Sequence, residues 1–132
     1  LSEQGIEPVI EMINGTDMPR FLVQNIAQAQ EMLEAVKHPA LKIQYDCYHM
    51  AMMGEDVLAG LQENLAQIGH IQFADCPNRH EPDTSDIAFQ AIFDWLLHNN
   101  YQGFIATEYK PKTHSNQSFA WKNKYFSNDV NT

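Results

Sequence analysis

Four apolar runs in this chain each end in a polar side chain that can bind a cation or carry a proton. The polar residues are Glu11, Asp46, Gln72 and Glu108. They recur about every 30 residues, which is the length of one strand with its returning helix. The spacing predicts four βα units in one parallel sheet. Because parallel strands end at the same rim, we expect the four groups to meet there, where such folds place their chemistry.

Apolar periodicity and turn residues predict the boundaries of the elements in these units. Strands are expected over residues 7–14, 41–46, 68–74 and 104–109, and helices over residues 21–36, 57–67 and 87–98, with a short helical signal around residues 119–125. The segment 47–56 reads as a loop, and so does the long polar segment 76–86. Acidic residues stand at three expected helix entrances and are interpreted as helix caps: Asp17, Asp56 and Asp86.

The alternation inside the strands predicts a barrel rather than an open sheet. In the second strand Ile43 and Tyr45 share one face, whereas Gln44 and Asp46 share the other. A parallel sheet covered by helices on both sides is apolar on both faces, so a polar face is unusual there. A polar face is normal at the mouth of a closed barrel, where it points into the lumen. The expected fold is therefore α/β, with a single domain over residues 1–132.

The four strand-end groups form an all-oxygen set, which suits Mg²⁺ or Mn²⁺ better than zinc. Taken singly, each acidic group is more simply a helix cap or a solvated charge, but the shared position on four units favours a site. His49 and Arg79 lie in segments that leave the same rim, and they could hold a hydroxyl or carbonyl oxygen and a carboxylate, respectively. Glu81 could pair with Arg79 and hold it in place.

The charge of the chain limits its partners. Eight basic and seventeen acidic residues give a formal net charge of −9. No broad basic surface is therefore expected, which argues against a nucleic-acid partner. No apolar run approaches the roughly 18 residues of a membrane span, and the first residues lack the layout of a signal peptide. We expect a cytoplasmic protein with no membrane partner.

Three segments of the chain resemble the hydroxypyruvate isomerase family, whose members are xylose isomerase-like TIM barrels. They read QYDCYHM, IGHIQFADCPNRHEPDT and YQGFIATEYKP, and the resemblance extends over residues 7–122. It implies that this chain is the C-terminal half of a (β/α)8 TIM barrel and supplies the last four βα units. The resemblance assigns a divalent metal to Glu11, Asp46, Gln72 and Glu108. It also implies substrate contacts for His49 and Arg79 and, less directly, for Glu81.

The activity implied by this resemblance is the interconversion of hydroxypyruvate and 2-hydroxy-3-oxopropanoate (tartronate semialdehyde), an aldose-ketose isomerisation. Glu11 and Glu108 would be the catalytic acid and base that move a proton between neighbouring carbons through an enediolate. The chain departs from the family near this site. Met12 replaces a proline that often follows the first glutamate, and Ser85 and Asp86 stand in DTSDIAF where relatives usually read GTGEINF.

Other function classes stay open at this point. A ketose 3-epimerase of the same superfamily uses a similar glutamate pair, although those enzymes usually present histidine at the position of Gln72. A non-catalytic half-barrel module is a second alternative, and a relative acting on DNA damage is a more distant one. Because a half barrel has two open sheet edges, we expect a homo-oligomer or pairing with an N-terminal half.

Overall fold

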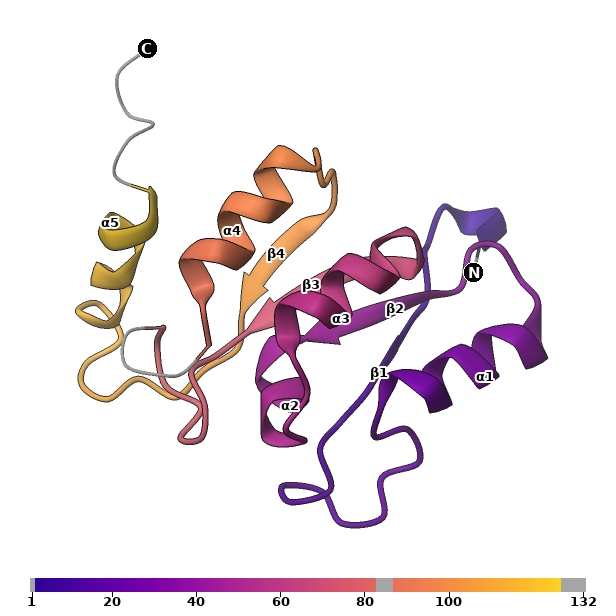
Figure 1. The fold of residues 1–132 in the computed structure, drawn as a ribbon, viewed down its shortest axis with the longest axis horizontal. Helices are drawn as coiled ribbons and strands as arrows, with labels where there is room; N and C mark the ends of the chain where they lie inside the picture. Colours follow the sequence, from indigo (N-terminus) through magenta and orange to yellow (C-terminus); the bar gives the residue numbers. More distant parts are fainter. Residues whose placement is uncertain (1, 83–86, 127–132) are drawn as a thin grey trace.

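The computed structural model describes residues 2–82 and 87–126, and in it four parallel strands form one sheet (Figure 1). The strands are β1 (Val9–Glu11), β2 (Lys42–Asp46), β3 (Ile68–Phe73) and β4 (Phe104–Thr107), hydrogen-bonded in the order β1-β2-β3-β4. Chain order and spatial order are therefore the same, as in consecutive βα units. The predicted α/β fold is confirmed, with four units of the kind that build a TIM barrel.

Helices connect the strands and follow the last one. The α-helices are α1 (Ile26–Val36), α2 (Cys47–Met52), α3 (Val57–Asn64), α4 (Phe89–His98) and α5 (Trp121–Phe126), and the 3₁₀ turns are η1 (Ser2–Gln4), η2 (Leu65–Gln67) and η3 (Ser118–Ala120). No helix within residues 2–82 and 87–126 is long and apolar enough to cross a lipid bilayer.

The two faces of the sheet differ as the alternation predicts. Tyr45 of β2 pairs with Ile71 of β3, and both are buried on the face that carries the helices. The Tyr45 hydroxyl donates to the Val57 carbonyl at the start of α3, 3.2 Å away. On the same face the Phe73 ring packs against Phe89 of α4, with centroids 5.7 Å apart. Because α3 and α4 cover this face, the alternate residues of β2 and β3 point to the opposite one.

β1 is shorter than the strand expected over residues 7–14. The chain leaves the sheet after Glu11, because the Ile13 N–H donates to the Val23 carbonyl at 3.0 Å instead of continuing the ladder. Met12 is completely buried in the core, and Asn14 is buried at the beginning of a turn. A long apolar run therefore divides into a strand that carries Glu11 and a turn that carries Asn14.

The helix caps agree only in part with the interpretation from sequence. Asp56 caps α3, because its carboxylate accepts a hydrogen bond from the Ala59 N–H at 3.0 Å. Asp17 caps no helix, since α1 begins later than expected and is capped by Asn25. Asp86 lies outside the described residues, as does Ser85.

The expectation of a loop over residues 47–56 is wrong for its first part, which forms α2. Asp46 ends β2 and directly caps this helix, because its Oδ1 accepts from the Tyr48 N–H at 2.9 Å. A capping aspartate favours a helix immediately after it, but the position shared by the four strand-end groups favours the interpretation of Asp46 as a metal ligand. The short helix buries His49 close to the end of β2.

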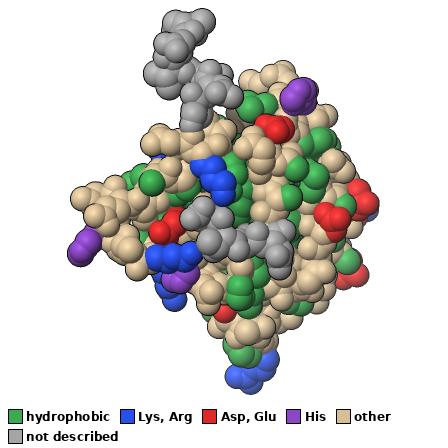
Figure 2. Space-filling view, turned by 60° about the vertical axis from the view of Figure 1, so that its left-hand side comes forward, with side chains coloured by type: hydrophobic (Ala, Val, Ile, Leu, Met, Phe, Trp, Pro, Cys, Tyr) green, Lys and Arg blue, Asp and Glu red, His purple; other side chains and the backbone are tan. Residues whose placement is uncertain are grey.

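The outer strands leave apolar side chains exposed. Phe104 of β4 is 84% exposed, and Val9 of β1 and Ile105 of β4 are also exposed. Figure 2 shows hydrophobic side chains reaching the surface at several places on one face of the molecule. Within the described part of the chain, β1 pairs only with β2 and β4 only with β3. The sheet is therefore open at both edges.

Candidate metal and substrate site

Asp46 lies at the centre of the site, at the junction of β2 and α2. Its side chain is only 1% exposed, and its two carboxylate oxygens have different surroundings. Oδ1 caps α2, whereas Oδ2 is buried and accepts no hydrogen bond from any residue that the structure describes. Leaving a buried carboxylate oxygen without a hydrogen bond is costly. Such an oxygen indicates a place for a cation or a substrate hydroxyl.

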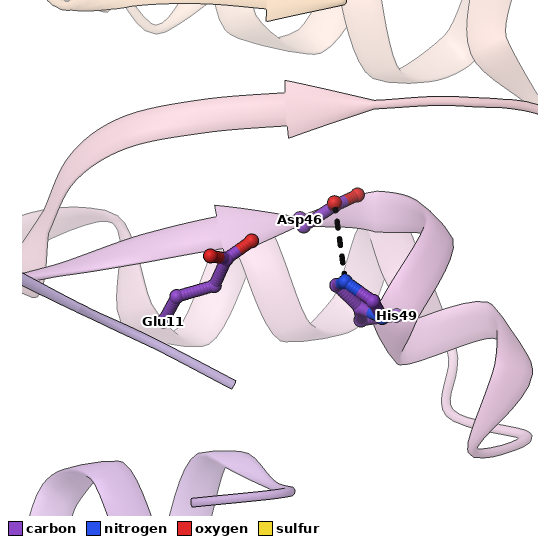
Figure 3. A group of neighbouring side chains, drawn as sticks. All are labelled: Glu11, Asp46 and His49. Atoms are coloured by element: carbon purple, nitrogen blue, oxygen red, sulfur yellow. Dashed lines mark ion pairs between the residues drawn. The ribbon is translucent and has the colours of Figure 1, made fainter. Parts of the chain in front are cut away.

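Glu11 and His49 approach Asp46 from two other elements. Glu11 ends β1, His49 lies in the first turn of α2, and one ligand atom from each of the three residues lies within 4.8 Å of the others. Figure 3 shows the three side chains converging at the end of the sheet. The Nε2 atom of His49 lies 3.7 Å from Asp46 Oδ2. Neighbouring parallel strands and the helix that follows them thus assemble this cluster.

Burial sets the proton affinities of this cluster. It raises the pKa of Asp46 to about 6, against the opposing effects of the Tyr48 N–H and Arg79. It also raises the pKa of Glu11, which a side-chain hydrogen bond from Gln44 partly counteracts and the charge of Glu108 reinforces. Glu11 and Asp46 therefore both hold protons more tightly than free carboxylates do, as expected for groups that exchange a proton or bind a cation.

His49 is a neutral base at physiological pH. Burial first, and then the nearby Arg79 charge, lower its pKa to about 4. Asn14 holds the other side of its ring, because the Asn14 side-chain nitrogen lies 2.7 Å from His49 Nδ1 and the Asn14 backbone nitrogen 3.3 Å away. The imidazole ring is thus fixed between the turn after β1 and the carboxylate of Asp46.

Arg79 brings the positive charge to the site. Its Nη2 lies 3.6 Å from Asp46 Oδ2 and forms an ion pair with Glu108. The guanidinium group also lies over the ring of Tyr48, 4.8 Å from the ring centroid, in a cation–π contact. Tyr48 is held in turn by Asp17, whose carboxylate accepts from the Tyr48 hydroxyl at 2.7 Å. Arg79 therefore links the end of β2 to the end of β4.

The structure places Gln72 beside Asp46 but gives its amide oxygen a partner. The two residues are register partners on β3 and β2. Gln44 donates from Nε2 to the Gln72 oxygen at 2.6 Å. Since an amide oxygen has two lone pairs, one remains for a cation. Gln44 thus connects Glu11 to Gln72, the two predicted ligands on the strands beside β2.

Glu108 and Glu81 lie farther out. Glu108 follows β4, and its side chain is 57% exposed and turned to Arg79. Glu81 does not form the ion pair with Arg79 that we considered from the sequence. Its carboxylate instead accepts from the Lys112 N–H at 3.0 Å, which joins the loop after β3 to the segment after β4. Glu81 thereby supports the loop that carries Arg79.

Two residues of the site were not singled out from the sequence, namely Asn14 and Tyr48. Asn14 follows Glu11 by three residues in a turn, and Tyr48 precedes His49 in a segment that we interpreted as a loop. A capping reading of Asp46 would have predicted a helix after β2 and turned attention to Tyr48. The contact of Asn14 with His49 spans 35 residues and has no local signal.

The donor set fits a hard divalent cation. Its members are carboxylate and amide oxygens, which Mg²⁺ and Mn²⁺ prefer. When Glu11, Asp46 and Glu108 are ionised, the Arg79 charge leaves two net negative charges among these four side chains. A divalent cation would balance them, and the Asp46 oxygen that accepts no hydrogen bond would supply a ligand.

Residues 1–125 match the family model described as Xylose isomerase-like TIM barrel. The chain belongs to this family. Hydroxypyruvate isomerase of Escherichia coli is 35% identical to it over 125 residues, which is 95% of this chain and 48% of that protein. The 2-oxo-tetronate isomerase of Cupriavidus necator is 35% identical over 122 residues, 92% of this chain and 47% of that protein.

A solved structure agrees closely with the fold. The crystal structure of an AP endonuclease, family 2, from Brucella melitensis superposes with a TM-score of 0.89 at 28% identity. The match covers 95% of this chain and 48% of that one. The chain thus spans about half the length of the relatives it matches. Its four βα units correspond to a half barrel of this family.

Proposed function

We propose that this chain carries the metal-binding and proton-transfer groups of a sugar-acid isomerase that interconverts hydroxypyruvate and 2-hydroxy-3-oxopropanoate. The observation that carries the proposal is the buried Asp46 Oδ2, which accepts no hydrogen bond from the described residues and faces Glu11, His49 and Arg79. The relationship to the E. coli hydroxypyruvate isomerase supports the choice of reaction. The proposed class is an intramolecular oxidoreductase acting on a small hydroxy-carbonyl acid.

Glu11, Asp46, Gln72 and Glu108 would hold the cation, for which we propose Mg²⁺ or Mn²⁺. When bound, the cation supplies positive charge beside the oxygens of the substrate, where negative charge develops in the enediolate. Hydrogen bonds within the chain orient the side chains of this proposed cation site without any bound ligand. Asp46 is held by the Tyr48 N–H, and Gln44 orients both Glu11 and Gln72.

The proton movements follow from the two glutamates. One carboxylate removes a proton from C3 of hydroxypyruvate, and an enediolate forms between C2 and C3. The second glutamate, as the acid, delivers a proton to C2, while the hydroxyl proton passes from the oxygen on C3 to the oxygen on C2. Glu11 suits proton exchange because burial raises its pKa.

Arg79 would bind the carboxylate of the substrate. Its guanidinium group has donors in a planar fork, which suits a carboxylate. In the present arrangement Arg79 pairs with Glu108 and faces Asp46. A substrate carboxylate would therefore compete with Glu108 for Arg79 and release Glu108 toward the reacting carbons.

The test is an isomerisation assay on hydroxypyruvate with added Mg²⁺ or Mn²⁺, followed by proton NMR of the product. It is run on this chain and on the chain joined to the part of the E. coli relative that it does not cover. Glu11→Gln and Glu108→Gln should each lower turnover by about 10²- to 10⁴-fold. Glu34→Gln is the matched control, because Glu34 is exposed on α1. Wild-type turnover in either site variant contradicts the proposal.

A second substrate has support of the same strength. The C. necator relative acts on a 2-oxo-tetronate according to its name, and its identity to this chain is also 35%. Both substrates are small hydroxy-carbonyl acids, so Arg79 would serve either one. Comparing kcat/KM for the two acids in the same assay decides between them, and turnover of ketohexoses instead would favour the 3-epimerase alternative.

Charge argues against a nucleic-acid function like that named for the Brucella protein. The net charge is −9, and a phosphate backbone is bound mainly by basic side chains. On the face shown in Figure 2, lysine and arginine side chains stand apart rather than forming one basic surface. A gel-shift assay with an abasic DNA duplex should therefore show no complex at physiological salt.

We also propose that the open edges of the sheet pair with further βα units. They would come either from a second copy of this chain or from an N-terminal half. The exposure of Phe104 and Ile105 on β4 and of Val9 on β1 supports this. If the isolated chain neither associates nor binds a cation, the alternative of a non-catalytic module gains support.

A further inference from the structure

Two nitrogen donors of Asn14 converge on one atom of the His49 ring. The backbone nitrogen of Asn14 lies 3.3 Å from His49 Nδ1, and its side-chain Nδ2 lies 2.7 Å from the same atom. Both residues are buried, so water does not readily replace either contact. A backbone N–H can only donate a hydrogen bond. At least one fixed donor therefore points at Nδ1.

The orientation of the Asn14 amide is settled by the turn that it forms. Its oxygen accepts from the Thr16 N–H at 3.1 Å and from the Asp17 N–H at 2.8 Å. Its nitrogen donates to a carboxylate oxygen of Asp17 at 3.1 Å. Exchanging the oxygen and nitrogen would set two donors against the amide nitrogen and an acceptor against the carboxylate. The group that faces His49 is consequently the NH₂ group, which also only donates.

An Nδ1 atom that accepts from these donors cannot itself carry a proton. The single proton of the neutral ring then lies on Nε2, the nitrogen 3.7 Å from Asp46 Oδ2. We infer that Asn14 locks His49 as the Nε2–H tautomer, so that His49 is a hydrogen-bond donor in this site and not a ligand of the cation. A nitrogen that bears a proton has no in-plane lone pair to offer a metal.

This assignment divides the cluster of Glu11, Asp46 and His49, whose ligand atoms all lie within 4.8 Å of one another. The two carboxylates remain available to the cation, whereas the imidazole ring faces them with an N–H. Arg79 Nη2 presents a second donor from another direction, 3.6 Å from Asp46 Oδ2. Neither donor is close enough to bond to this oxygen, so each can reach an oxygen of a substrate. That last role rests on the proposed function, whereas the tautomer does not.

Nitrogen-15 NMR of the full chain with labelled histidines tests the assignment directly. The chain has six histidines, and the His49 signals are identified by their loss in His49→Gln. We expect a pyridine-like Nδ1 and a pyrrole-like Nε2 with its attached proton in the wild type. A proton on Nδ1 of neutral His49 would overturn the inference, whatever the protein catalyses.

The same spectrum is then recorded with Mg²⁺ and with Zn²⁺, which binds histidine more readily. The Nε2 proton should remain in both cases. Its loss on addition of either ion would make His49 a ligand and overturn the inference. If neither ion binds, the proposed metal function fails, while the spectrum of the metal-free chain still decides the tautomer.

Asn14→Asp tests the positioning role of Asn14. It keeps the size of the side chain and an acceptor for the turn, but it replaces the NH₂ group by an oxygen that attracts a proton to Nδ1. The His49 signals should therefore change toward an Nδ1–H ring. Asn25→Asp makes the same change at the cap of α1, where the Asn25 side chain accepts from the Gln28 N–H, and it should leave these signals as they are. Unchanged His49 signals in a folded Asn14→Asp protein would contradict the role, and the wild-type spectrum decides the tautomer if that variant does not fold.

Discussion

The two central strands and the two outer strands contribute to the candidate site in different ways. β2 ends in Asp46, which is buried and held by the helix it caps, and β3 carries Gln72 beside it. β1 and β4 lead to Glu11 and Glu108, of which Glu11 is half-buried and Glu108 is largely exposed. The central strands thus define the position of the site, whereas the groups proposed to move protons lie at the edges.

The difference follows from the number of neighbours that a strand has. β2 and β3 are each paired on both sides, and they contain five and six residues. β1 and β4 each have one pairing partner within the described residues and contain three and four residues. A strand paired on one side leaves backbone groups and side chains to solvent. The environment of both glutamates therefore depends on whatever covers the edges.

The largest expected effect is on stability at the centre of the sheet. Phe73 of β3 is 3% exposed and contacts Phe89, Phe93 and Trp121. Phe73→Ala should lower the free energy of unfolding by about 3 to 5 kcal/mol, because it leaves a cavity. Phe104→Ala at the edge should lower it by less than about 0.5 kcal/mol. Urea unfolding measures both losses of free energy. Similar losses in the two variants would contradict the expected difference between the centre and the edge of the sheet.

The next effect concerns association through the edge. Phe104→Lys places a charge beside β4, and it removes an aromatic ring whose burial is worth about 1.5 to 3 kcal/mol. The substitution should shift the protein toward the monomer in sedimentation velocity. Val36→Lys is the control, because Val36 is an exposed apolar residue at the end of α1. A wild-type chain that stays monomeric at high concentration would show that the edges are not pairing surfaces.

A smaller effect is expected from pH on cation binding. The raised pKa of Asp46, about 6, means that its carboxyl group is protonated below that pH and ionised above it. A proton on Asp46 competes with the cation, so the affinity for Mn²⁺ should be about tenfold lower near pH 5 than near pH 7. The raised pKa of Glu11 acts in the same direction. Isothermal titration calorimetry at several pH values measures how the affinity for Mn²⁺ changes with pH.

The stability of the metal-free chain should change with pH in the opposite direction to its affinity for the cation. Because folding raises the pKa of Asp46, its contribution to stability is present below the pKa of the unfolded chain and is lost as pH rises through about 6. Stabilisation by added Mn²⁺, measured as a thermal shift, should therefore be greater near pH 7 than near pH 5. An affinity that does not change with pH would remove Asp46 from the ligand set.

The smallest effect is expected at a residue outside the site. Asp56→Ala removes the cap of α3 and should lower the free energy of unfolding by about 1 kcal/mol. Asp56→Asn keeps an acceptor for the Ala59 N–H and should restore most of this loss. Cation binding should stay the same in both variants. A change in cation binding would show that the helix-covered side of the sheet influences the site, which we do not expect.

The sequence by itself determined the order of strands and helices and the face on which each strand residue lies. Strand alternation is a local property, so the inward direction of Asp46 and the burial of Tyr45 could be predicted without a partner strand. The same holds for the cap at Asp56. The prediction failed where two local signals overlapped, as at Asp46, whose capping role produces α2 where we expected a loop.

Only the tertiary structure decided which side chains meet. The contact of Asn14 with His49 and the ion pair of Arg79 with Glu108 join residues 35 and 29 positions apart, and both depend on strand order and register. The length of β1 was also decided in this way, because Ile13 bonds to Val23 instead of the sheet. Local patterns specify direction along a strand, but the environment of a group is set by neighbours that the fold brings from elsewhere in the chain.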